Sequence, residues 1–371
     1  MLKLHQEMID NELCIRLHDR MYSIADDARG VREKFWLVRE SGRIQYDEPL
    51  RTRSILFKFN RNDKSCEDWG EVYASSIARK MGVICVDYYS AALYDDHKNL
   101  IGNGVLCGNY KKHNRETEYS GFDIQNMIHN FVYEECASKK IKGLNTVDGF
   151  IFAITKLFGD KLSYQQINQI RNSLIKQAIF DFLLAQTDRH WLNTTFLVSE
   201  IAGEFNMYKA GCYDNGCIAL LKRKLSAIEG MSREIGKLGK DSPYLKNKLD
   251  GYCPMFGIKT STVVIEDRTG KCGLDRLKVV EPQQSREVFL DELAEEILTN
   301  PEIAVFFKKL ETMQERGIIA EVTNELVAAG DNPPECVSKM IKDVVGHQFD
   351  VLSQRVHTRL RDYQQHGEGG M

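Results

Sequence analysis

The chain contains the stretch Asp188-Arg189-His190-Trp191-Leu192-Asn193 and, about twenty residues later, Tyr213-Asp214-Asn215-Gly216. The first stretch places an acid and an amide five residues apart, and the second adds another acid. Phosphoryl transfer from ATP needs one carboxylate to orient the acceptor hydroxyl, and an amide and a second carboxylate to hold the metal on the phosphates. The two stretches together therefore indicate an ATP-dependent kinase.

The residues between the two stretches predict a β-hairpin. The apolar segments 196–198 and 207–209 have strand character and flank a turn at Ala202-Gly203. Residues equidistant from a hairpin turn lie near each other in an antiparallel pair. We therefore expect Asn193 and Asp214 to meet at the open end of the hairpin, where two oxygen ligands suit Mg²⁺.

Each piece of this pattern has an ordinary alternative when it stands alone. An isolated Asp-Asn pair is usually a turn or a helix cap, and Asp-Asn-Gly is more often a hairpin turn than a metal site. The order and spacing of the pieces after an apolar helix favour the kinase interpretation, in which Asp188 accepts a hydrogen bond from the acceptor hydroxyl. His190 either orients Asp188 or touches phosphate, although a purely structural histidine is an equal alternative.

A lysine and a glutamate in the N-terminal part complete the predicted site. Alternate side chains of the strand Ile55–Phe59 share a face, so Lys58 lies opposite the apolar face of that strand. A helix is expected from about Asp68 to Met81, because apolar residues recur there every four positions. A strand lysine can bind the α/β-phosphates while a helix glutamate, Glu71, holds it in place. The alternative is a surface lysine and a surface glutamate.

Two further segments are predicted to contact ATP. Gly30-Val31-Arg32-Glu33-Lys34 precedes a strand and could form a phosphate-covering turn in which Gly30 lets the backbone approach the nucleotide. A charged β-turn is the alternative, since the stretch is neither G-x-G-x-x-G nor a Walker A sequence. The adenine is expected near Leu106, Cys107 and Gly108.

The distribution of strand and helix patterns predicts an α+β fold, and the family resemblance given below implies that this fold is bilobal and protein-kinase-like. Residues 1–108 indicate a small β-rich N-lobe with one long helix, and residues 109–363 indicate a larger, mainly helical C-lobe. Within the C-lobe, weak periodicity at 222–262 predicts loops and short helices. Residues 364–371 have the composition of a disordered tail.

The composition excludes several classes of protein. A formal net charge of −3 gives no global attraction to nucleic acid or anionic lipid, so no direct nucleic-acid binding is predicted. The 10 cysteines include no C-x-x-C pair, which favours a reducing compartment over a disulfide scaffold or zinc ribbon. No segment approaches 18 apolar residues and no signal-peptide pattern is present, so the expected location is the cytoplasm, with delivery into a host cell remaining open.

The order of motifs resembles the HipA-like branch of the protein-kinase-like superfamily. Gly30-x-x-Glu33-Lys34 looks like its phosphate-binding loop, Leu56-Phe57-Lys58 like its lysine strand, and Trp69-Gly70-Glu71 like its glutamate helix. Asp188-x-His190-x-x-Asn193 is similar to its catalytic loop, and Tyr213-Asp214-Asn215-Gly216 to its metal-binding segment. The similarity covers roughly residues 23–220.

The resemblance implies a serine/threonine protein kinase that uses ATP and Mg²⁺ on an unidentified protein substrate. Some family members are toxins held by an antitoxin, so an antitoxin or inhibitor partner is also implied. Toxin members carry an autophosphorylated serine three residues before the loop glycine, where this chain has Asp27, which argues against self-inactivation there. The short stretch before the loop is expected to leave no room for the additional N-terminal domain of longer toxin members.

Two alternatives remain open. Asp-Arg-His-x-x-Asn is also the catalytic-loop pattern of phosphoinositide kinases, and the basic run Lys222-Arg223-Lys224 after Asp214 is compatible with a lipid substrate. A pseudokinase that binds nucleotide or a partner as a scaffold is the non-enzymatic alternative. The complete set of catalytic residue types argues against the scaffold.

Overall fold

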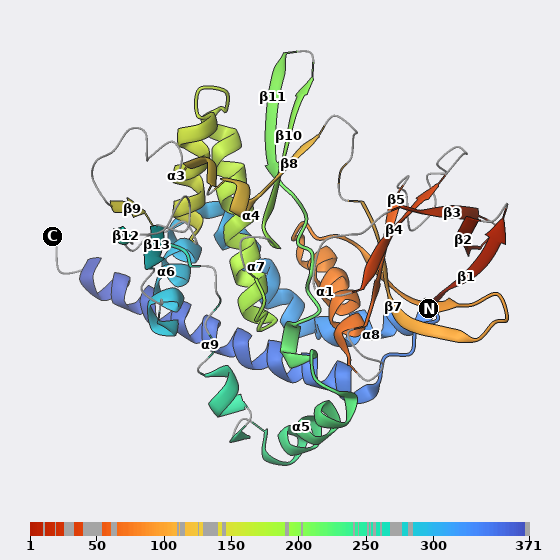
Figure 1. Ribbon diagram of the computed structural model, residues 1–371. Coiled ribbons are helices and arrows are strands. Elements are labelled where there is room, and N and C mark those ends of the chain that lie inside the picture. The colour runs from red at the N-terminus through yellow and green to blue at the C-terminus, as the bar shows by residue number, and fades with distance from the viewer. Residues whose placement is uncertain are drawn as a thin grey trace. The chain divides into compact units, whose positions relative to one another are not determined.

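The chain of the computed structural model, drawn in Figure 1, divides into two compact units. The first comprises Met1–Lys112, Gly211–Lys246 and Met313–Val345, and the second comprises His113–Ala210, Asn247–Thr312 and Gly346–Met371. The structure describes residues 1–9, 12–18, 20–25, 33–39, 54–60, 65–109, 111, 116–124, 126–128, 140–142, 146–189, 193–201, 203–239, 242–243, 245–250, 252, 254, 257–259, 262–267, 277–280 and 285–367. The predictions for Asp27, Gly30 and His190 lie outside these ranges.

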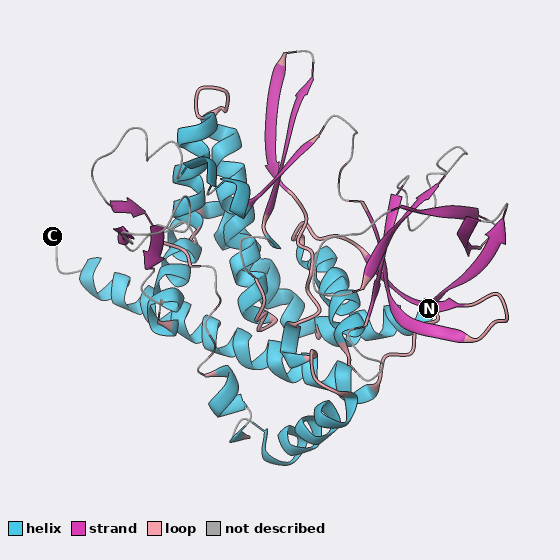
Figure 2. Ribbon diagram, viewed as in Figure 1, coloured by secondary structure: helices cyan, strands magenta, loops and turns pink. Residues whose placement is uncertain are grey.

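A closed barrel of seven strands dominates the first unit (Figure 2). Antiparallel pairs connect its strands in the order β1-β2-β3-β4-β5-β7-β6, and a parallel pair between β1 and β6 closes it. Closure leaves no exposed sheet edge within the paired region. The strands are β1 (Leu2–Ile9), β2 (Glu12–Leu17), β3 (Arg20–Ala25), β4 (Lys34–Arg39), β5 (Ser54–Phe59), β6 (Tyr88–Tyr94) and β7 (Leu100–Gly108).

Alternating side chains of these strands fill the barrel. Ile55 and Phe57 of β5 are fully buried in this core, and Phe59 packs against it. Lys58 therefore lies on the outer face, as the alternation predicted. The other buried core residues are Leu4, Ile15, Leu17, Tyr22, Leu37, Ala91, Leu93 and Leu106.

The outer face of the barrel packs against one long helix, α1 (Glu67–Met81). Its observed bounds confirm the helix predicted from apolar periodicity. Gly82 ends it in the left-handed conformation (φ 80°), with its N–H donating to the Ala78 carbonyl. The helix is buried on nearly all sides because it also contacts α8 (Ile318–Ala328), where Tyr73 and Thr323 share a hydrogen bond of 3.0 Å between their hydroxyls.

The segment that follows Asp214 also belongs to the first unit. It contains a 3₁₀ turn, η2 (Ile218–Leu220), and a helix of 14 residues, α5 (Leu225–Leu238). Ile228, Ser232 and Ile235 form the buried side of α5, a spacing of four and three residues. The expectation of only loops and short helices over 222–262 is therefore wrong here, because a narrow buried stripe gives weak periodicity on a charged helix.

The second unit is mainly helical, with two small three-stranded sheets. Helix α4 ends just before Asp188 and begins with a capping box between Ser163 and Gln166. Strands β11, β10 and β8 form one sheet, and β13, β12 and β9 form the other. The elements wholly within this unit are β8 (Thr117–Ser120), β9 (Lys140–Lys142), α3 (Val147–Phe158), α4 (Tyr164–Leu183), β10 (Thr195–Ile201), β11 (Glu204–Lys209), β12 (Thr262–Asp267), β13 (Leu277–Val280) and α6 (Arg286–Thr299).

Three elements continue across the boundaries between the units. They are η4 (Leu245–Leu249), a single π-helical turn, α7 (Pro301–Arg316) and α9 (Glu335–Gly367). Helix α9 continues into the stretch that composition predicted as a disordered tail, and residues 368–371 lie outside the described ranges. The chain is thus a mixed α+β protein with a β-rich N-terminal region and a helical C-terminal part, as predicted.

Candidate active site

Lys58 lies at the centre of a buried cluster of charged residues in the first unit. It is on β5 with only 5% of its side chain exposed, and its Nζ donates to Oε1 of Glu71 at 2.7 Å. Glu71 is fully buried on α1. Lys58 Nζ also donates to Oδ1 of Asp214, whose side chain is 33% exposed. The structure therefore brings together three of the predicted site residues, and the ammonium group is paired as a buried charge requires.

Glu71 also holds the metal-binding segment predicted from the sequence. Its second oxygen, Oε2, accepts a hydrogen bond of 2.6 Å from the backbone N–H of Asn215. The backbone N–H of Asp214 donates to the Tyr88 hydroxyl at 3.3 Å. Asp214 has a φ of 57°, in the left-handed region that non-glycine residues rarely occupy. One carboxylate thus fixes both the lysine and the segment that carries Asp214.

Backbone pairing attaches this segment to the entry of β6. The Cys212 N–H donates to the Ile84 carbonyl, and the Val86 N–H donates to the Cys212 carbonyl, both at 2.9 Å. Further along, the Cys66 N–H donates to the Leu221 carbonyl at 3.1 Å, at the N-terminus of α1. Asp214 therefore lies on a segment, residues 212–221, whose two ends are hydrogen-bonded to the rest of the first unit. We call this segment the strap.

Gly70 permits a close approach between α1 and this strap. A Cβ atom on Gly70 would lie 2.8 Å from the Gly216 carbonyl oxygen and 3.1 Å from its carbonyl carbon and Cα. Backbone atoms cannot rotate out of the way as a side chain can. A glycine at this position is therefore required by space rather than by backbone conformation.

The predicted ATP-contacting residues of the barrel divide between its two faces. Leu106 is fully buried in the barrel core. Cys107, the next residue, faces the opposite side, where burial raises the pKa of its thiol to about 12 although the Lys58 ammonium opposes this shift. Lys34 is directly across from Lys58 in the β4–β5 register, so both lysines project from the outer face. Gly108 ends β7 opposite Ile55.

Burial also dominates the environment of Tyr88, the residue that contacts Asp214. It raises the pKa of the Tyr88 hydroxyl well above its ordinary value, and the nearby Glu71 carboxylate raises it further. The hydroxyl therefore stays protonated and neutral near neutral pH. Sequence patterns gave no signal for Tyr88, because an aromatic residue at the start of a strand is commonplace.

Asp188 and Asn193 lie in one loop of the second unit. Asp188 is half-buried, and its N–H donates to Oε1 of Gln186 at 3.2 Å. Asn193 is 6% exposed, and its side-chain nitrogen Nδ2 donates to the Asp188 carbonyl at 2.8 Å. Because the side-chain nitrogen makes this bond, the other end of the Asn193 amide is the oxygen Oδ1. Residues 190–192, including His190, lie outside the described ranges.

A buried ion pair beneath this loop was missed by the sequence analysis. Arg189 and Asp181 are both fully buried and make two parallel bonds of 3.0 Å, from Nε and Nη2 to the two carboxylate oxygens. Arg189 Nη1 also donates to the Asn193 carbonyl at 3.2 Å. The available signal was an aspartate within the apolar end of α4, eight residues before an arginine. Charges in such a segment need a partner.

The hairpin between the two motifs has the predicted strands. Strand β10 pairs with β11 from Phe196 opposite Lys209 to Ile201 opposite Glu204, and Gly203 occupies the turn with a φ of 83°. The register centres the turn one position earlier than the midpoint of 193 and 214. Asn193 belongs to the second unit and Asp214 to the first, so their meeting around a metal stays a prediction.

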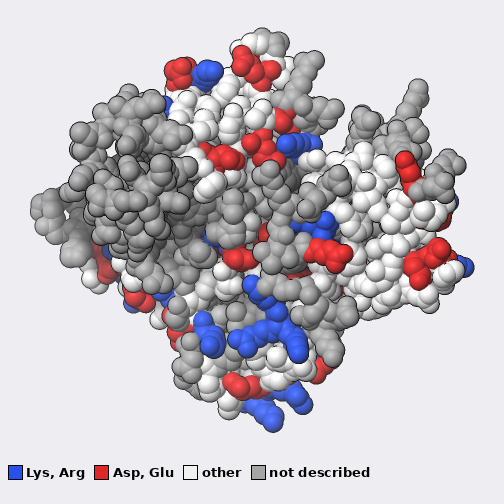
Figure 3. Space-filling view, in the orientation of Figure 1, with Lys and Arg blue, Asp and Glu red and all other residues white. Residues whose placement is uncertain are grey.

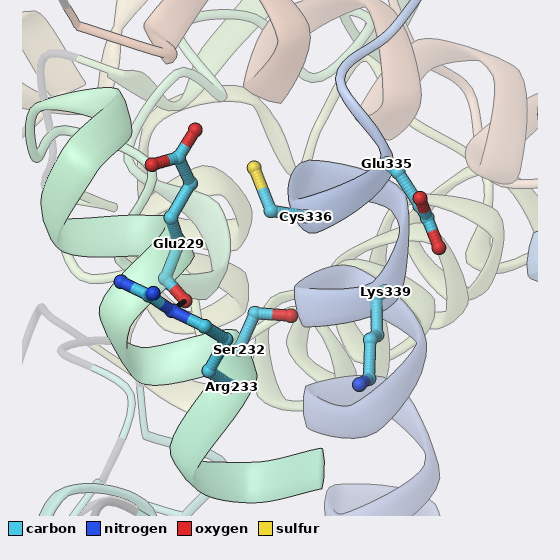
Figure 4. Close-up of a pocket in the computed structure, with 6 residues that line it drawn as sticks. All are labelled: Glu229, Ser232, Arg233, Glu335, Cys336 and Lys339. Carbon is cyan, nitrogen blue, oxygen red and sulfur yellow. Dashed lines mark hydrogen bonds between the residues drawn. The ribbon is translucent and has the colours of Figure 1, made fainter.

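A cavity of about 320 Å³ lies between α5 and the first turns of α9, in the first unit (Figure 4). None of the predicted site residues lines it. Cys336 and Ser232 extend into the space between the two helices, and burial together with the Glu229 carboxylate raises the pKa of the Cys336 thiol. The lining residues are Glu229, Ser232, Arg233, Glu335, Cys336 and Lys339.

Basic side chains gather over the segment that leads from η2 into α5 (Figure 3). Lys222, Arg223 and Lys224 are exposed there. In the described part of the chain, no three His, Cys, Asp or Glu side chains are grouped so that they could hold a metal. Within the same ranges, no helix combines the length and apolar character needed to cross a membrane.

Comparisons with known proteins bear on the fold. No protein-family model matches the sequence, and no curated protein matches it. The crystal structure of the Helicobacter pylori proinflammatory kinase CtkA is similar with a TM-score of 0.56 at 12% identity, covering 91% of this chain and 96% of that chain. The structure of the Shewanella oneidensis MR-1 toxin HipA, solved with HipB and operator DNA, matches with a TM-score of 0.41 at 10% identity, covering 81% of this chain and 58% of that chain. The similarity to CtkA bears on the fold alone: this chain shares the fold of that kinase, in agreement with the predicted kinase-like fold.

Proposed function

We propose that this protein is an ATP-dependent kinase that transfers the γ-phosphate to a serine or threonine of a protein substrate. The observation that carries the proposal is the buried cluster in which Lys58 is bonded by both Glu71 and Asp214. A buried lysine fixed by a helix glutamate beside a metal-binding aspartate is the arrangement that ATP-dependent phosphotransferases use. The kinase-like fold supports the same conclusion.

Lys58 is the residue that binds the ATP phosphates in this proposal, and Glu71 holds it in position. Lys34, across the β4–β5 ladder, adds a second positive charge on the same face. Gly30 is proposed to let the backbone of the phosphate loop approach the nucleotide. The adenine is proposed to lie near Leu106, Cys107 and Gly108, although the inward-facing Leu106 side chain leaves contact there to its neighbours.

Asp214 and Asn193 are proposed to hold Mg²⁺. A partly exposed carboxylate and an amide oxygen are hard donors, and Mg²⁺ typically takes one or two protein carboxylates and completes its shell with phosphate oxygens and water. The donor set therefore fits. When bound, the ion would neutralise charge on the phosphates. Because Asn193 Nδ2 is bonded to the Asp188 carbonyl, the oxygen Oδ1 is the end of the amide assigned to the ligand role.

Asp188 is proposed to orient the acceptor hydroxyl by accepting its hydrogen bond. Its backbone is bonded on both sides, by Gln186 at the N–H and Asn193 at the carbonyl. These bonds fix the backbone from which the carboxylate projects, which favours a reproducible position for the substrate hydroxyl. His190, two residues on, is proposed to assist Asp188 or contact phosphate.

The partners of the protein are proposals of the same kind. ATP and a protein substrate follow from the reaction, and the cytoplasm is the proposed location. The antitoxin or inhibitor that the HipA-like resemblance implies stays a prediction, because nothing in the described residues identifies its binding surface.

The test is transfer of radiolabelled phosphate from ATP, with Mg²⁺, to protein in a cell lysate and to phosphoinositide vesicles in parallel. Label on protein supports the proposal, and label on lipid alone would establish the phosphoinositide-kinase alternative. Asp188→Asn and Asp214→Ala should each abolish transfer with the fold intact. Asp160→Asn, an exposed aspartate in the turn between α3 and α4, is the matched control and should leave transfer unchanged.

A binding measurement separates an inactive scaffold from an enzyme whose substrate is absent. A ligand that binds only the folded state stabilises it by RT ln(1 + [L]/Kd), about 2.7 kcal/mol at a hundredfold excess over Kd. ATP with Mg²⁺ should therefore raise the melting temperature, and Lys58→Ala should reduce the rise. An unchanged melting temperature together with no labelled product would contradict the proposed function.

A further inference from the structure

The ion pair between Asp181 and Arg189 lies in the buried interior of the second unit, where charged side chains are rarely found. Both side chains are fully buried, and the last turns of α4 around Asp181 are apolar except for the buried Gln177, whose Nε2 also donates to Asp181 Oδ2 at 3.4 Å. Removing two charges from water is costly, and replacing a buried ion pair by apolar residues is often neutral or stabilising. Stability alone therefore does not account for this pair.

The guanidinium group of Arg189 connects α4 to the far end of the catalytic loop. Two of its nitrogens bond the Asp181 carboxylate, and the third, Nη1, donates to the Asn193 carbonyl. The Asn193 side chain in turn donates to the Asp188 carbonyl. The two proposed site residues of this unit are thus tied to each other and to one rigid guanidinium plane.

Asp181 is itself fixed by its surroundings. Its backbone carbonyl accepts the Gln186 N–H at 2.9 Å and lies 3.1 Å from the Tyr252 hydroxyl. The Tyr252 hydroxyl is also 2.7 Å from the Gln186 carbonyl, and Gln186 Oε1 accepts the Asp188 N–H. The turn from α4 to the loop is therefore bonded at each step, from Asp181 through Gln186 to Asp188.

We propose that Asp181 and Arg189 are a positioning pair that sets the spacing between the Asp188 carboxylate and the Asn193 amide. Neither residue touches a substrate in this inference, which rests on the proposed kinase function. The pair orients the metal-ligating amide relative to the hydroxyl-orienting carboxylate before ATP binds. Preorganisation of this kind matters because a misplacement of about 1 Å can cost on the order of a hundredfold in rate.

The experiment compares the apolar double variant Asp181→Leu/Arg189→Met with a matched double variant on the same helix. Arg171 of α4 makes a comparable two-bond pair with Glu296 of α6, at 2.5 and 2.8 Å, and Arg171→Met/Glu296→Leu is the control. We expect the Asp181/Arg189 variant to stay folded but to lose about a hundredfold in kcat. Its half-saturating Mg²⁺ concentration should rise about tenfold, since residues behind metal ligands typically affect affinity on that scale.

The control should keep the wild-type Mg²⁺ requirement and kcat, whatever its melting temperature. Arg189→Lys keeps the charge but lacks the fork that reaches Asn193, so it should show the same loss of kcat with Asp181 still paired. Wild-type kcat and Mg²⁺ dependence in a folded Asp181→Leu/Arg189→Met variant would overturn the inference, and so would failure of both Arg189 variants to fold, which would mark the pair as purely structural.

These outcomes are distinct from failure of the kinase proposal. If the wild-type protein neither transfers phosphate nor binds ATP, the proposed function is wrong, and the positioning role is wrong with it. If the wild-type protein is active and the double variant is equally active, the positioning role alone is wrong.

Discussion

Substitution of Gly70 by alanine should destabilise the protein, in contrast to the usual effect of such a change within a helix. In an exposed helix, Gly→Ala stabilises by up to about 1 kcal/mol because alanine loses less backbone entropy on folding. At Gly70 the new Cβ would lie 2.8 Å from the Gly216 carbonyl oxygen, about 0.6 Å closer than ordinary contact at 3.4 Å. Both sides of the contact are backbone, so α1 or the strap must move.

The structure provides a matched control in α5. Gly230 is an exposed helical glycine, and a Cβ there would meet no atom within 4 Å. Overpacking typically costs about 1–3 kcal/mol, so Gly70→Ala should be less stable than Gly230→Ala by roughly 1–3 kcal/mol after the shared propensity gain. For a domain of this size that difference corresponds to about 3–9 °C in melting temperature.

The assay is thermal unfolding of both variants beside the wild-type protein, followed by phosphate transfer. Gly216 is two residues from Asp214, so Gly70→Ala should also lower the transfer rate by about tenfold under the proposed function. The Gly230→Ala protein should transfer at the wild-type rate. If Gly70→Ala were as stable as Gly230→Ala, the close contact between α1 and the strap would not exist as described.

Three further predictions follow from the cluster and the cavity. Glu71→Gln should destabilise by about 2–4 kcal/mol, because glutamine replaces one of the two accepting oxygens by an NH2 group, which cannot accept from either Lys58 Nζ or the Asn215 N–H; urea unfolding measures this, and a loss below about 0.5 kcal/mol would contradict it. Tyr88→Phe should reduce the loss of unfolding free energy that the wild-type protein shows above about pH 10. Folding raises the pKa of the Tyr88 hydroxyl, so the stability that this group contributes is complete below its pKa in the unfolded chain and declines as pH rises toward its pKa in the folded protein. Unfolding at pH 8 and 11 tests this, and an equal decline in both proteins would refute it. Glu229→Gln should speed alkylation of Cys336 at pH 8, because removing the carboxylate lowers the pKa of the thiol; mass spectrometry of iodoacetamide-treated protein gives the rate, and an unchanged rate would show that the Glu229 carboxylate does not raise this pKa.

Local patterns predicted the elements that carry the cluster. The alternation over Ile55–Phe59 placed Lys58 opposite the barrel core, and the four-residue periodicity placed α1. The hairpin strands also followed from two short apolar segments around Gly203. These features depend on neighbours in the sequence, since backbone geometry alone fixes which side chains share a face.

Other features of the site could not be read from the sequence. The helix α5 was missed because only three of its residues form the buried stripe. The ion pair of Asp181 and Arg189 was missed because the position of an aspartate in an apolar helix does not indicate which basic residue it will pair with. The roles assigned to the site residues, and the meeting of Asn193 with Asp214 around a metal, remain predictions.

The sequence by itself determined which residue types are available for phosphate transfer and on which faces of strands and helices they lie. Only the tertiary structure decided that Glu71 bonds both Lys58 and the Asn215 N–H, and that Gly70 allows this by its lack of a side chain. Glu71 and Asn215 are 144 residues apart along the chain. Such contacts form only when the whole first unit closes around its core, because no local backbone preference specifies a distant partner.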